Sequence, residues 1–365
     1  HLELNKICKG FDHPVIDRLS LKVGKGEFFV IVGPSGIGKT TLLRCIAGLE
    51  KLDEGEIFIE GENVTNVPPY NRNVAMTFES YALYPHMTVF ENIANPLKAL
   101  KKEDSLIRSR VYEIAELLQI DGLLERKQHE ISGGQKQRTA LGRTLAAHPR
   151  VFLLDEPISH LDAKIRAELR TQFHTLEALR EVSTVYVTHD YAEALSLGDR
   201  IGVMGNGGLV QIGTAHEIYE KPNSLFVAQH LGQPSINSLG IDLIEEAEKP
   251  SAIAGSLKLP VDLNHWEHLK RKNITKCTLG IRPQFFKVVN GDQSSKDNSL
   301  ELNGMVEVYE ALGAYGVMIT SVVGQKLTVL TDPEDKYDHD ENIKIRIDPS
   351  TFNYFDLNNG VNLIP

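Results

Sequence analysis

One stretch decides the fold of this chain: EFFVIVGPSGIGKTTLLRCIAG, residues 27–48. The apolar run at 28–32 has the composition of a β-strand and stops at a glycine-rich loop. A helix-type pattern follows at once, and Gly48 is a suitable helix stop. The order of strand, loop and helix indicates an α/β core.

The loop has the spacing of a phosphate-binding motif. Gly33 and Gly38 frame the pattern G-x-x-x-x-G-K-[ST], in which backbone N–H groups and the helix N-terminus surround a phosphate. Lys39 would meet the outer phosphates, and the Thr40 hydroxyl would ligate Mg²⁺. We therefore predict a nucleotide site. The motif alone does not distinguish kinases, GTPases, helicases and transport ATPases. The predicted nucleotide contacts are Gly33, Ser35, Gly36, Gly38, Lys39, Thr40 and Thr41.

Composition narrows the classes of function. A chain of 365 residues with 41% hydrophobic residues can form two or three domains. Its 39 Lys and Arg against 49 Asp and Glu, a formal charge of −10, argue against a nucleic-acid partner. Three widely spaced cysteines fit reduced thiols in a cytosolic protein. The apolar runs are too short to cross a membrane, so we expect any membrane role to depend on another chain.

The rest of the chain supports an α/β core followed by a β-rich tail. Two strands, at 2–6 and 15–23, flank a turn that contains Phe11, which would be either a half-buried packing residue or a residue that stacks on a nucleobase. Residues 88–147 have a helical pattern and indicate an inserted helical region. Short strands after residue 276 predict a small β-barrel or sandwich. Residues 291–297 are predicted to be an exposed loop.

Three polar strand ends are expected to meet at one edge of the sheet. Asp155 and Glu156 follow the apolar strand at 151–154, and His189 follows the strand at 183–188. Ligands gather outside the carboxyl ends of parallel strands, where Lys39 also lies. We assign Asp155 to the Mg²⁺ shell, Glu156 to activation of water and His189 to the terminal phosphate. The alternative for each residue alone is a solvated loop charge.

A second glycine-rich helix start lies at ISGGQKQRTAL, residues 131–141. Ser132 is a helix cap, and a helix N-terminus favours anions. This stretch is either an ordinary capped helix or half of a phosphate site that two chains share.

Together these motifs resemble those of ABC transporter ATP-binding subunits. The resemblance rests on the phosphate loop, ISGGQ at 131–135, the acidic strand end at 151–157, SHLD at 159–162 and His189, in that order. It implies that ATP is the nucleotide and that Phe11 stacks on adenine. It also implies that Ser132 and Gly134 contact the ATP held by the opposite subunit. The nucleotide contacts implied at the dimer seam are Ser132, Gly133, Gly134, Gln135 and Asp162.

Other stretches resemble the carbohydrate importers of the maltose and glycerol-phosphate group. These are YALYPHMTV at 81–89, LGIRPQ at 279–284, Phe355-Asp356 and Asn359-Gly360. The resemblance implies an ABC ATPase domain at 1–235, with a helical subdomain at about 86–148, and an OB-like β-rich regulatory domain at 236–365. The implied partners are a second ATPase subunit, transmembrane permease subunits and, indirectly, an extracytoplasmic solute-binding protein. The implied location is the cytoplasmic face of the membrane.

Three residues depart from the family pattern. Glu79 stands where Gln usually contacts Mg²⁺, and as a carboxylate it would either tighten the metal or repel the nucleotide. His160 replaces the usual Asn, and Ile131 replaces the usual Leu. Since the latter two lie near the dimer seam, pairing with a different ATPase subunit is an alternative to a homodimer.

Three other functions stay open. Polyamine, iron and sulfate importers have related subunits. A soluble ABC-type ATPase acting on nucleic acid or ribosomes would be expected to carry a second cassette, a coiled coil or a basic arm, none of which the sequence shows. A non-catalytic regulatory subunit fits Glu79 but not the retained Lys39, Asp155, Glu156 and His189.

Overall fold

The computed structural model describes residues 1–78, 80–174, 176, 179, 181–246, 249–289 and 300–364. The chain forms two compact units, His1–Ile218 and Tyr219–Pro365. The division falls before residue 235, where the sequence analysis placed the end of the ATPase domain. The predicted loop at 291–297 and Glu79 both lie outside the described residues.

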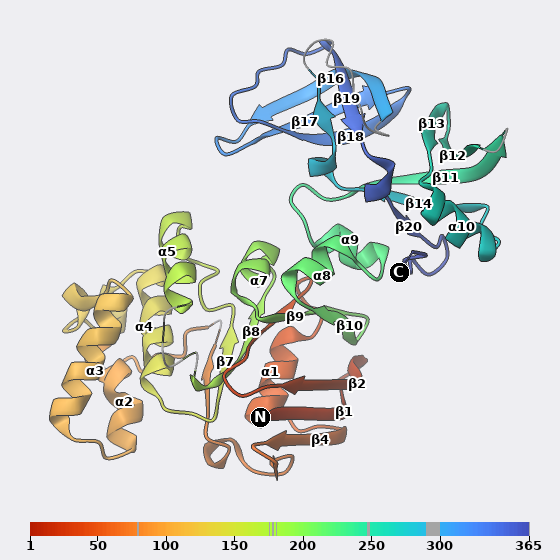
Figure 1. Cartoon of the computed structure of the whole chain (residues 1–365). Helices are drawn as coiled ribbons and strands as arrows, with labels where there is room; N and C mark the ends of the chain where they lie inside the picture. The colour runs from red at the N-terminus through yellow and green to blue at the C-terminus, as the bar shows by residue number, and fades with distance from the viewer. Residues whose placement is uncertain are drawn as a thin grey trace. The chain divides into compact units, whose positions relative to one another are not determined.

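A six-stranded sheet carries the first unit, in the order β10-β9-β3-β8-β7-β6 (Figure 1). All neighbours pair in parallel except β10 with β9. Every residue of β3, β7 and β8 is buried, as expected for strands covered on both faces. The strands are β3 (Phe28–Val32), β6 (Val74–Thr77), β7 (Val151–Asp155), β8 (Ser183–Thr188), β9 (Arg200–Gly205) and β10 (Gly208–Gly213).

An antiparallel sheet lies beside this core, in the order β2-β1-β4-β5. One hydrophobic cluster joins residues of β1, β2, β3 and β4 to the buried face of α1 (Lys39–Ala47). The helix after the phosphate loop is therefore fixed by core packing. The strands of this sheet are β1 (Leu2–Gly10), β2 (Pro14–Val23), β4 (Glu54–Ile59) and β5 (Glu62–Asn63).

Three helices form the predicted helical region: α2 (Val89–Ala99), α3 (Asp104–Leu117) and α4 (Gly133–Ala146), seen at the left of Figure 1. They pack closely at Gly142, where an added Cβ would lie 3.1 Å from Leu118 Cδ1. The remaining helices of this unit are α5 (Ala163–Phe173), α7 (Tyr191–Leu197) and the start of α8 (Ala215–Glu220), and its short 3₁₀ turns are η1 (Pro69–Asn71), η2 (Asp121–Leu123) and η3 (Gln128–Glu130).

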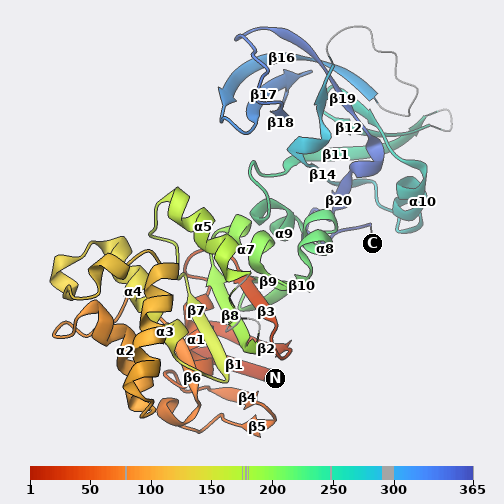
Figure 2. The same cartoon turned by 60° about the vertical axis from the view of Figure 1, so that its left-hand side comes forward.

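The second unit is built from two five-stranded antiparallel sheets around one hydrophobic cluster (Figure 2). The first sheet contains β11 (Asn237–Glu246), β12 (Lys249–Ala254), β13 (Leu257–Pro260), β14 (Lys276–Ile281) and β20 (Asn353–Phe355). The second contains β15 (Lys287–Val288), β16 (Leu300–Ala311), β17 (Gly316–Val322), β18 (Gln325–Thr331) and β19 (Asn342–Ile347). The sequence analysis missed its two helices, α9 (Leu225–His230) and α10 (Leu263–Arg271). Two 3₁₀ turns complete it, η4 (Pro283–Phe285) and η5 (Pro349–Thr351).

No helix within the described ranges is long and apolar enough to cross a membrane.

Candidate functional site at the carboxyl edge of the sheet

The phosphate loop connects β3 to α1 through glycines that no other residue could replace without strain. Gly36 and Gly38 have φ of 77° and 109°, in the region that favours glycine. At Gly33 an added Cβ would lie 2.6 Å from the carbonyl oxygen of Met204. Gly38 is also the N-cap of α1, and it provides no side-chain cap. The first-turn amides of α1 are therefore presented for an anionic ligand.

Lys39 folds back over this loop. Its side chain is only 5% exposed, and Nζ donates 2.9 Å hydrogen bonds to the carbonyl oxygens of Gly33 and Pro34. Burial lowers the pKa of Lys39, and the carboxylates of Glu156 and Asp155 oppose that effect. The ammonium is therefore held beside the loop, where its positive charge would lie next to a bound phosphate.

Thr40 and Asp155 meet from neighbouring elements. Thr40 Oγ1 donates to Asp155 Oδ1 at 3.2 Å, and the Asp155 backbone N–H donates to Thr77 Oγ1 at 2.9 Å. Mg²⁺ in nucleotide sites uses one or two protein oxygens together with waters and phosphates. A hydroxyl and a buried carboxylate in contact fit that donor set. The described residues contain no cluster of three His, Cys, Asp or Glu that could hold a metal alone.

Glu156 and His189 form a direct pair. Glu156 Oε1 and His189 Nδ1 are 2.8 Å apart, with 17% and 51% of the respective side chains exposed. The Glu156 backbone has φ of 45°, which is uncommon for a residue with a Cβ. Its N–H donates to the Val187 carbonyl, and its carbonyl accepts from Gln137 Nε2. These bonds hold the carboxylate at the edge shared with Lys39.

The second glycine-rich stretch begins α4, as predicted. Ser132 Oγ accepts from the Gln135 N–H, and Gln135 Oε1 accepts from the Ser132 N–H, which together make a capping box. An added Cβ at Gly134 would lie 3.4 Å from Leu161. Asp162 caps α5 through the Ile165 N–H. Ser132, Gly133, Gly134 and Gln135 therefore lie near the loop that leads to Asp162, a second group of site residues within the chain.

Phe11 is 61% exposed in the turn between β1 and β2. Lys9 Nζ lies 4.9 Å from the centre of its ring. Of the two interpretations, the exposure favours a stacking residue over a half-buried packing residue. The surrounding turn encloses a cavity of about 550 Å³ lined by Phe11, Lys9, His13 and Arg18 among others.

Two supporting residues were missed by the sequence analysis. Gln137 on α4 is 4% exposed; its Nε2 donates to the Glu156 carbonyl and its Oε1 accepts from the His160 N–H. Glu193 on α7 is 1% exposed and accepts 2.8 Å hydrogen bonds from the hydroxyls of Tyr186 and Thr188. In the sequence each is only a polar residue within a helical pattern. The fold is needed to show that it lies on the buried face of its helix.

The segment that follows Glu79 is tied to α4. Tyr81 and Ala82 have φ of 62° and 45°, and Arg143 donates to both of their carbonyl oxygens. The Tyr81 ring also lies edge-on to His160, with centroids 6.4 Å apart. Two strained residues are thus fixed by one arginine beside the predicted dimer seam.

Comparisons with known proteins agree with this geometry. Residues 16–159 match the family model described as ABC transporter. The chain is 38% identical over 366 residues to the sn-glycerol-3-phosphate import ATP-binding protein UgpC of Yersinia pseudotuberculosis, covering 100% of this chain and 99% of the relative. It is 42% identical over 330 residues to UgpC of Salmonella paratyphi A, with 90% of each chain covered. It is 39% identical to the uncharacterized ABC transporter ATP-binding protein YurJ of Bacillus subtilis, over 95% of this chain and 93% of the relative.

Solved structures of ABC transporter cassettes also match this chain, over 59% of its length. A dimeric bacterial ABC transporter cassette matches with a TM-score of 0.55 and 28% identity, over 59% of this chain and 99% of that chain. A post-hydrolysis cassette bound to ADP and Pi matches with a TM-score of 0.54 and 27% identity, over the same shares.

Proposed function

Because this chain belongs to the family of ABC transporter ATP-binding proteins, we propose that it is the ATP-hydrolysing subunit of an importer for a carbohydrate or a related solute. The observation that carries the proposal is the Glu156–His189 pair, 2.8 Å apart, at the strand edge that also holds Lys39. A positioned base and a cation beside a phosphate loop are what hydrolysis of a terminal phosphate requires.

Each polar residue at this edge has a separate task. The amides of the loop and Lys39 bind the phosphates, and Glu156 accepts a proton from the attacking water. His189 is hydrogen-bonded to Glu156, so it orients that carboxylate and can reach the terminal phosphate. Thr40 and Asp155 would hold Mg²⁺, which neutralises phosphate charge when bound.

The site is completed by a second subunit. Ser132, Gly133, Gly134, Gln135 and Asp162 lie on exposed or half-exposed turns, and we assign them to the ATP of the partner. The dimeric form of the matching cassette supports this arrangement. ATP that bridges two subunits favours the closed dimer, because only that state offers both sets of contacts.

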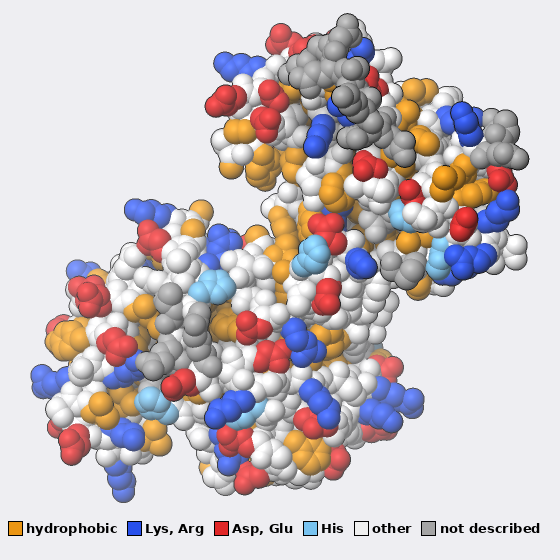
Figure 3. All heavy atoms as spheres, viewed as in Figure 1, with side chains coloured by type: hydrophobic (Ala, Val, Ile, Leu, Met, Phe, Trp, Pro, Cys, Tyr) orange, Lys and Arg blue, Asp and Glu red, His pale blue; other side chains and the backbone are white. Residues whose placement is uncertain are grey.

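Permease subunits and an extracytoplasmic solute-binding protein would complete the importer, with this chain peripheral on the cytoplasmic face. The names of the Yersinia and Salmonella relatives support a glycerol-phosphate-type solute. On the face shown in Figure 3, Lys and Arg side chains are interspersed with Asp and Glu. This pattern gives no support to a nucleic-acid partner.

The variant Glu156→Gln tests the catalytic assignment. It should bind ATP with unchanged affinity and lose nearly all turnover, because the amide cannot take the proton. Glu116→Gln, on the exposed face of α3, is the matched control and should hydrolyse ATP at the parental rate. Parental turnover in Glu156→Gln would exclude this carboxylate as the base.

The transport role is tested by purifying the chain from its own membranes in detergent. We expect membrane subunits to co-purify, and a solute-loaded binding protein to stimulate hydrolysis. Stimulation by a glycerol-phosphate-loaded protein supports the proposed substrate class, whereas stimulation by a polyamine-, iron- or sulfate-loaded protein would redirect it. Co-purification with RNA in place of membrane subunits would contradict the importer.

A further inference from the structure

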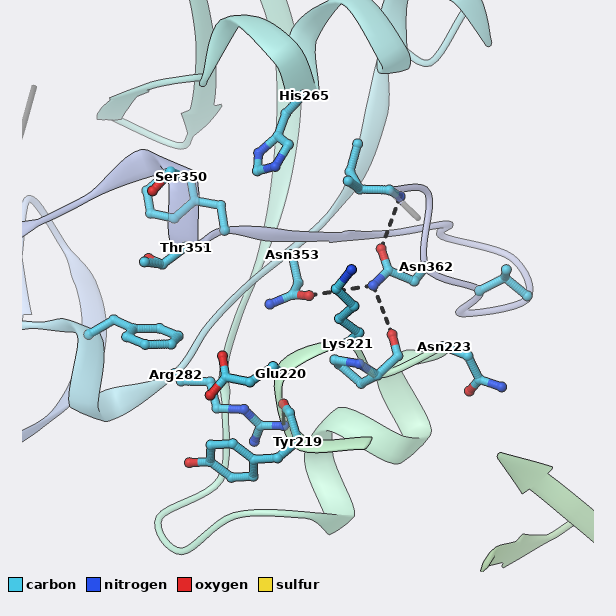
Figure 4. Close-up of a pocket in the computed structure, with 15 residues that line it drawn as sticks. Tyr219, Glu220, Lys221, Asn223, His265, Arg282, Ser350, Thr351, Asn353 and Asn362 are labelled. Carbon is cyan, nitrogen blue, oxygen red and sulfur yellow. Dashed lines mark hydrogen bonds between the residues drawn. The ribbon is translucent and has the colours of Figure 1, made fainter. Parts of the chain in front are cut away.

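The second unit contains a cavity of about 560 Å³ (Figure 4). This volume is within the range of about 300–1,000 Å³ that is typical of small-molecule sites. Its walls come from segments far apart in the sequence: the residues after α8, His265 of α10, Arg282 after β14, the η5 region and the C-terminal strand region. None of the nucleotide-site residues lines it.

The His265 backbone N–H donates to Asp262 Oδ1 at 3.2 Å, but its side chain has no hydrogen bond within the described part of the chain. Its Nδ1 is buried and unpartnered, and its ring is directed into the cavity (Figure 4). Burial lowers the pKa of His265, which favours the neutral ring with one N–H donor and one acceptor nitrogen. The ring packs edge-on against Tyr354, with centroids 5.6 Å apart. The buried Tyr354 hydroxyl is likewise unpartnered among the described residues.

The wall of the cavity opposite His265 is held in place by hydrogen bonds within the protein. Arg282 is 2% exposed and donates to the carbonyl oxygens of Tyr219, Ala228 and Leu231. Asn362 Nδ2 donates to the carbonyl oxygen of Pro222 at 2.8 Å. Because these bonds link separate segments, the cavity keeps its shape without a ligand, which reduces the entropy cost of binding.

The remaining polar groups combine donors and acceptors. Hydroxyls come from Ser350 and Thr351, beside the rings of Phe285 and Phe352. The Thr351 hydroxyl donates to the Asp348 carbonyl oxygen, so toward a ligand it is an acceptor. Asn362 Nδ2 donates to Asn353 Oδ1, which leaves Asn353 Nδ2 as a donor. Lys221 and Glu220 bring opposite charges, and the Lys221 side chain extends into the cavity in Figure 4. Groups that both donate and accept, next to apolar ring surfaces, suit a ligand in which each hydroxyl does the same.

We propose that this cavity is a binding site for a small polyhydroxylated solute, a sugar or polyol or its phosphate ester, with His265 contacting a ligand hydroxyl. A phosphate group, where present, would lie at Lys221. The site is separate from ATP hydrolysis and does not rest on the proposed function, because binding is expected in full-length protein without nucleotide.

Isothermal titration of the full chain without nucleotide tests this site. The probes are glucose, glucose 6-phosphate, glycerol, sn-glycerol 3-phosphate and inorganic phosphate. We expect saturable binding of at least one hydroxylated probe with a Kd below about 10 mM. His265→Leu should weaken that binding by about tenfold or more, which is the loss expected for a hydrogen bond in a desolvated site. His268→Leu is the matched control on α10, since His268 does not line the cavity, and should leave the Kd unchanged.

Two further variants keep the test informative if His265→Leu is unstable. Thr351→Val removes one hydroxyl, together with its 2.7 Å hydrogen bond to the Asp348 carbonyl oxygen, while preserving the shape of the side chain. Where thermal unfolding shows that it is folded, it should weaken binding of every hydroxylated probe that binds. Lys221→Met should weaken only the phosphate esters, which separates them from neutral sugars. The proposal is overturned if no hydroxylated probe binds, if inorganic phosphate binds as tightly as the esters, or if folded His265→Leu and Thr351→Val both bind as the parent does.

Discussion

The chain contains two glycine-rich helix starts that both resemble anion sites, yet they are built differently. At α1 the N-cap is Gly38, no side chain caps the helix, and the following Lys39 is buried. At α4 the N-cap is Ser132, whose capping box with Gln135 satisfies the backbone amides of these two residues at an exposed helix start. The first start leaves its amides for a ligand within the same chain. The second already has two of its amides capped by its own side chains, and its remaining groups can add contacts when another molecule faces it.

This difference indicates two roles for one type of motif. An uncapped, buried start binds its phosphate strongly, because the amides and the lysine have no better partner. At a capped start the Ser132 hydroxyl can still donate its hydrogen to an anion, and the helix dipole still attracts that anion. Neither contact requires more than a small structural change.

Replacement of the α1 lysine should have the largest effect. Lys39→Met should reduce ATP affinity and lower hydrolysis by more than about 100-fold, since a buried cation beside the phosphates is lost. Lys98→Met, in the last turn of α2, is the control and should bind ATP normally in equilibrium titration. Normal ATP affinity and turnover in Lys39→Met would remove the distinction between the two helix starts.

Substitutions at Ser132 separate capping from ATP contact. Ser132→Asp keeps a strong N-cap but places a carboxylate where we expect the partner's phosphate. It should preserve thermal stability, preserve ATP binding to the isolated chain and lower dimer-dependent hydrolysis by about tenfold or more. Ser132→Ala should cost about 1 kcal/mol of stability through the lost cap and affect hydrolysis less. If Ser132→Asp hydrolysed ATP at the parental rate, α4 would be only a capped helix.

A substitution at a third helix start, that of α7, should have a smaller effect, which is on stability and depends on pH. Asp190 caps it, and Glu193 in its first turn is buried. Burial raises the pKa of Glu193 above 4.5, despite hydrogen bonds from Thr188 and Tyr186. The folded state therefore binds the proton more tightly than the unfolded state, and this contribution to stability is lost as pH rises through the folded pKa.

Glu193→Gln does not titrate and can still accept both hydroxyl hydrogen bonds. Its melting temperature relative to the parent should therefore increase between about pH 4.5 and pH 7, as measured by thermal unfolding. Glu217→Gln is the control, because hydrogen bonds from Thr214 lower the pKa of the exposed Glu217. Its melting temperature relative to the parent should therefore change with the opposite sign, and only below about pH 4.5. A constant difference between Glu193→Gln and the parent across this range would mean that Glu193 is not the titrating group.

Local patterns explain why the first unit could be predicted so well. The β3–loop–α1 order, the helical insertion and the β7 and β8 strands follow from residues adjacent in the sequence. Lys39, Asp155, Glu156 and His189 follow strands of the same parallel sheet, so their shared edge followed from the strand assignments. Gln137 and Glu193 were missed because their contacts depend on how helices pack, which periodicity does not specify.

The cavity of the second unit, in contrast, could not be predicted from local sequence patterns. His265, Arg282 and Asn362 belong to separate segments, and only the folded chain brings them around one cavity. Arg282 lies in the LGIRPQ stretch, which indicated a family but no cavity. The sequence predicted the β-rich character of this unit but neither α10 nor the cavity. A site that depends on contacts between distant segments leaves no local pattern in the sequence, so it is recognised only in the structure.

We propose that the α1 start of one chain and the α4 start of another together form one hydrolysis site. Its most direct test is ATPase activity per chain over a range of protein concentrations, with the oligomeric state measured by light scattering in the same samples. We predict that activity per chain rises with the dimer fraction and approaches zero where the chain is monomeric. Full activity per chain in strictly monomeric samples would contradict this account.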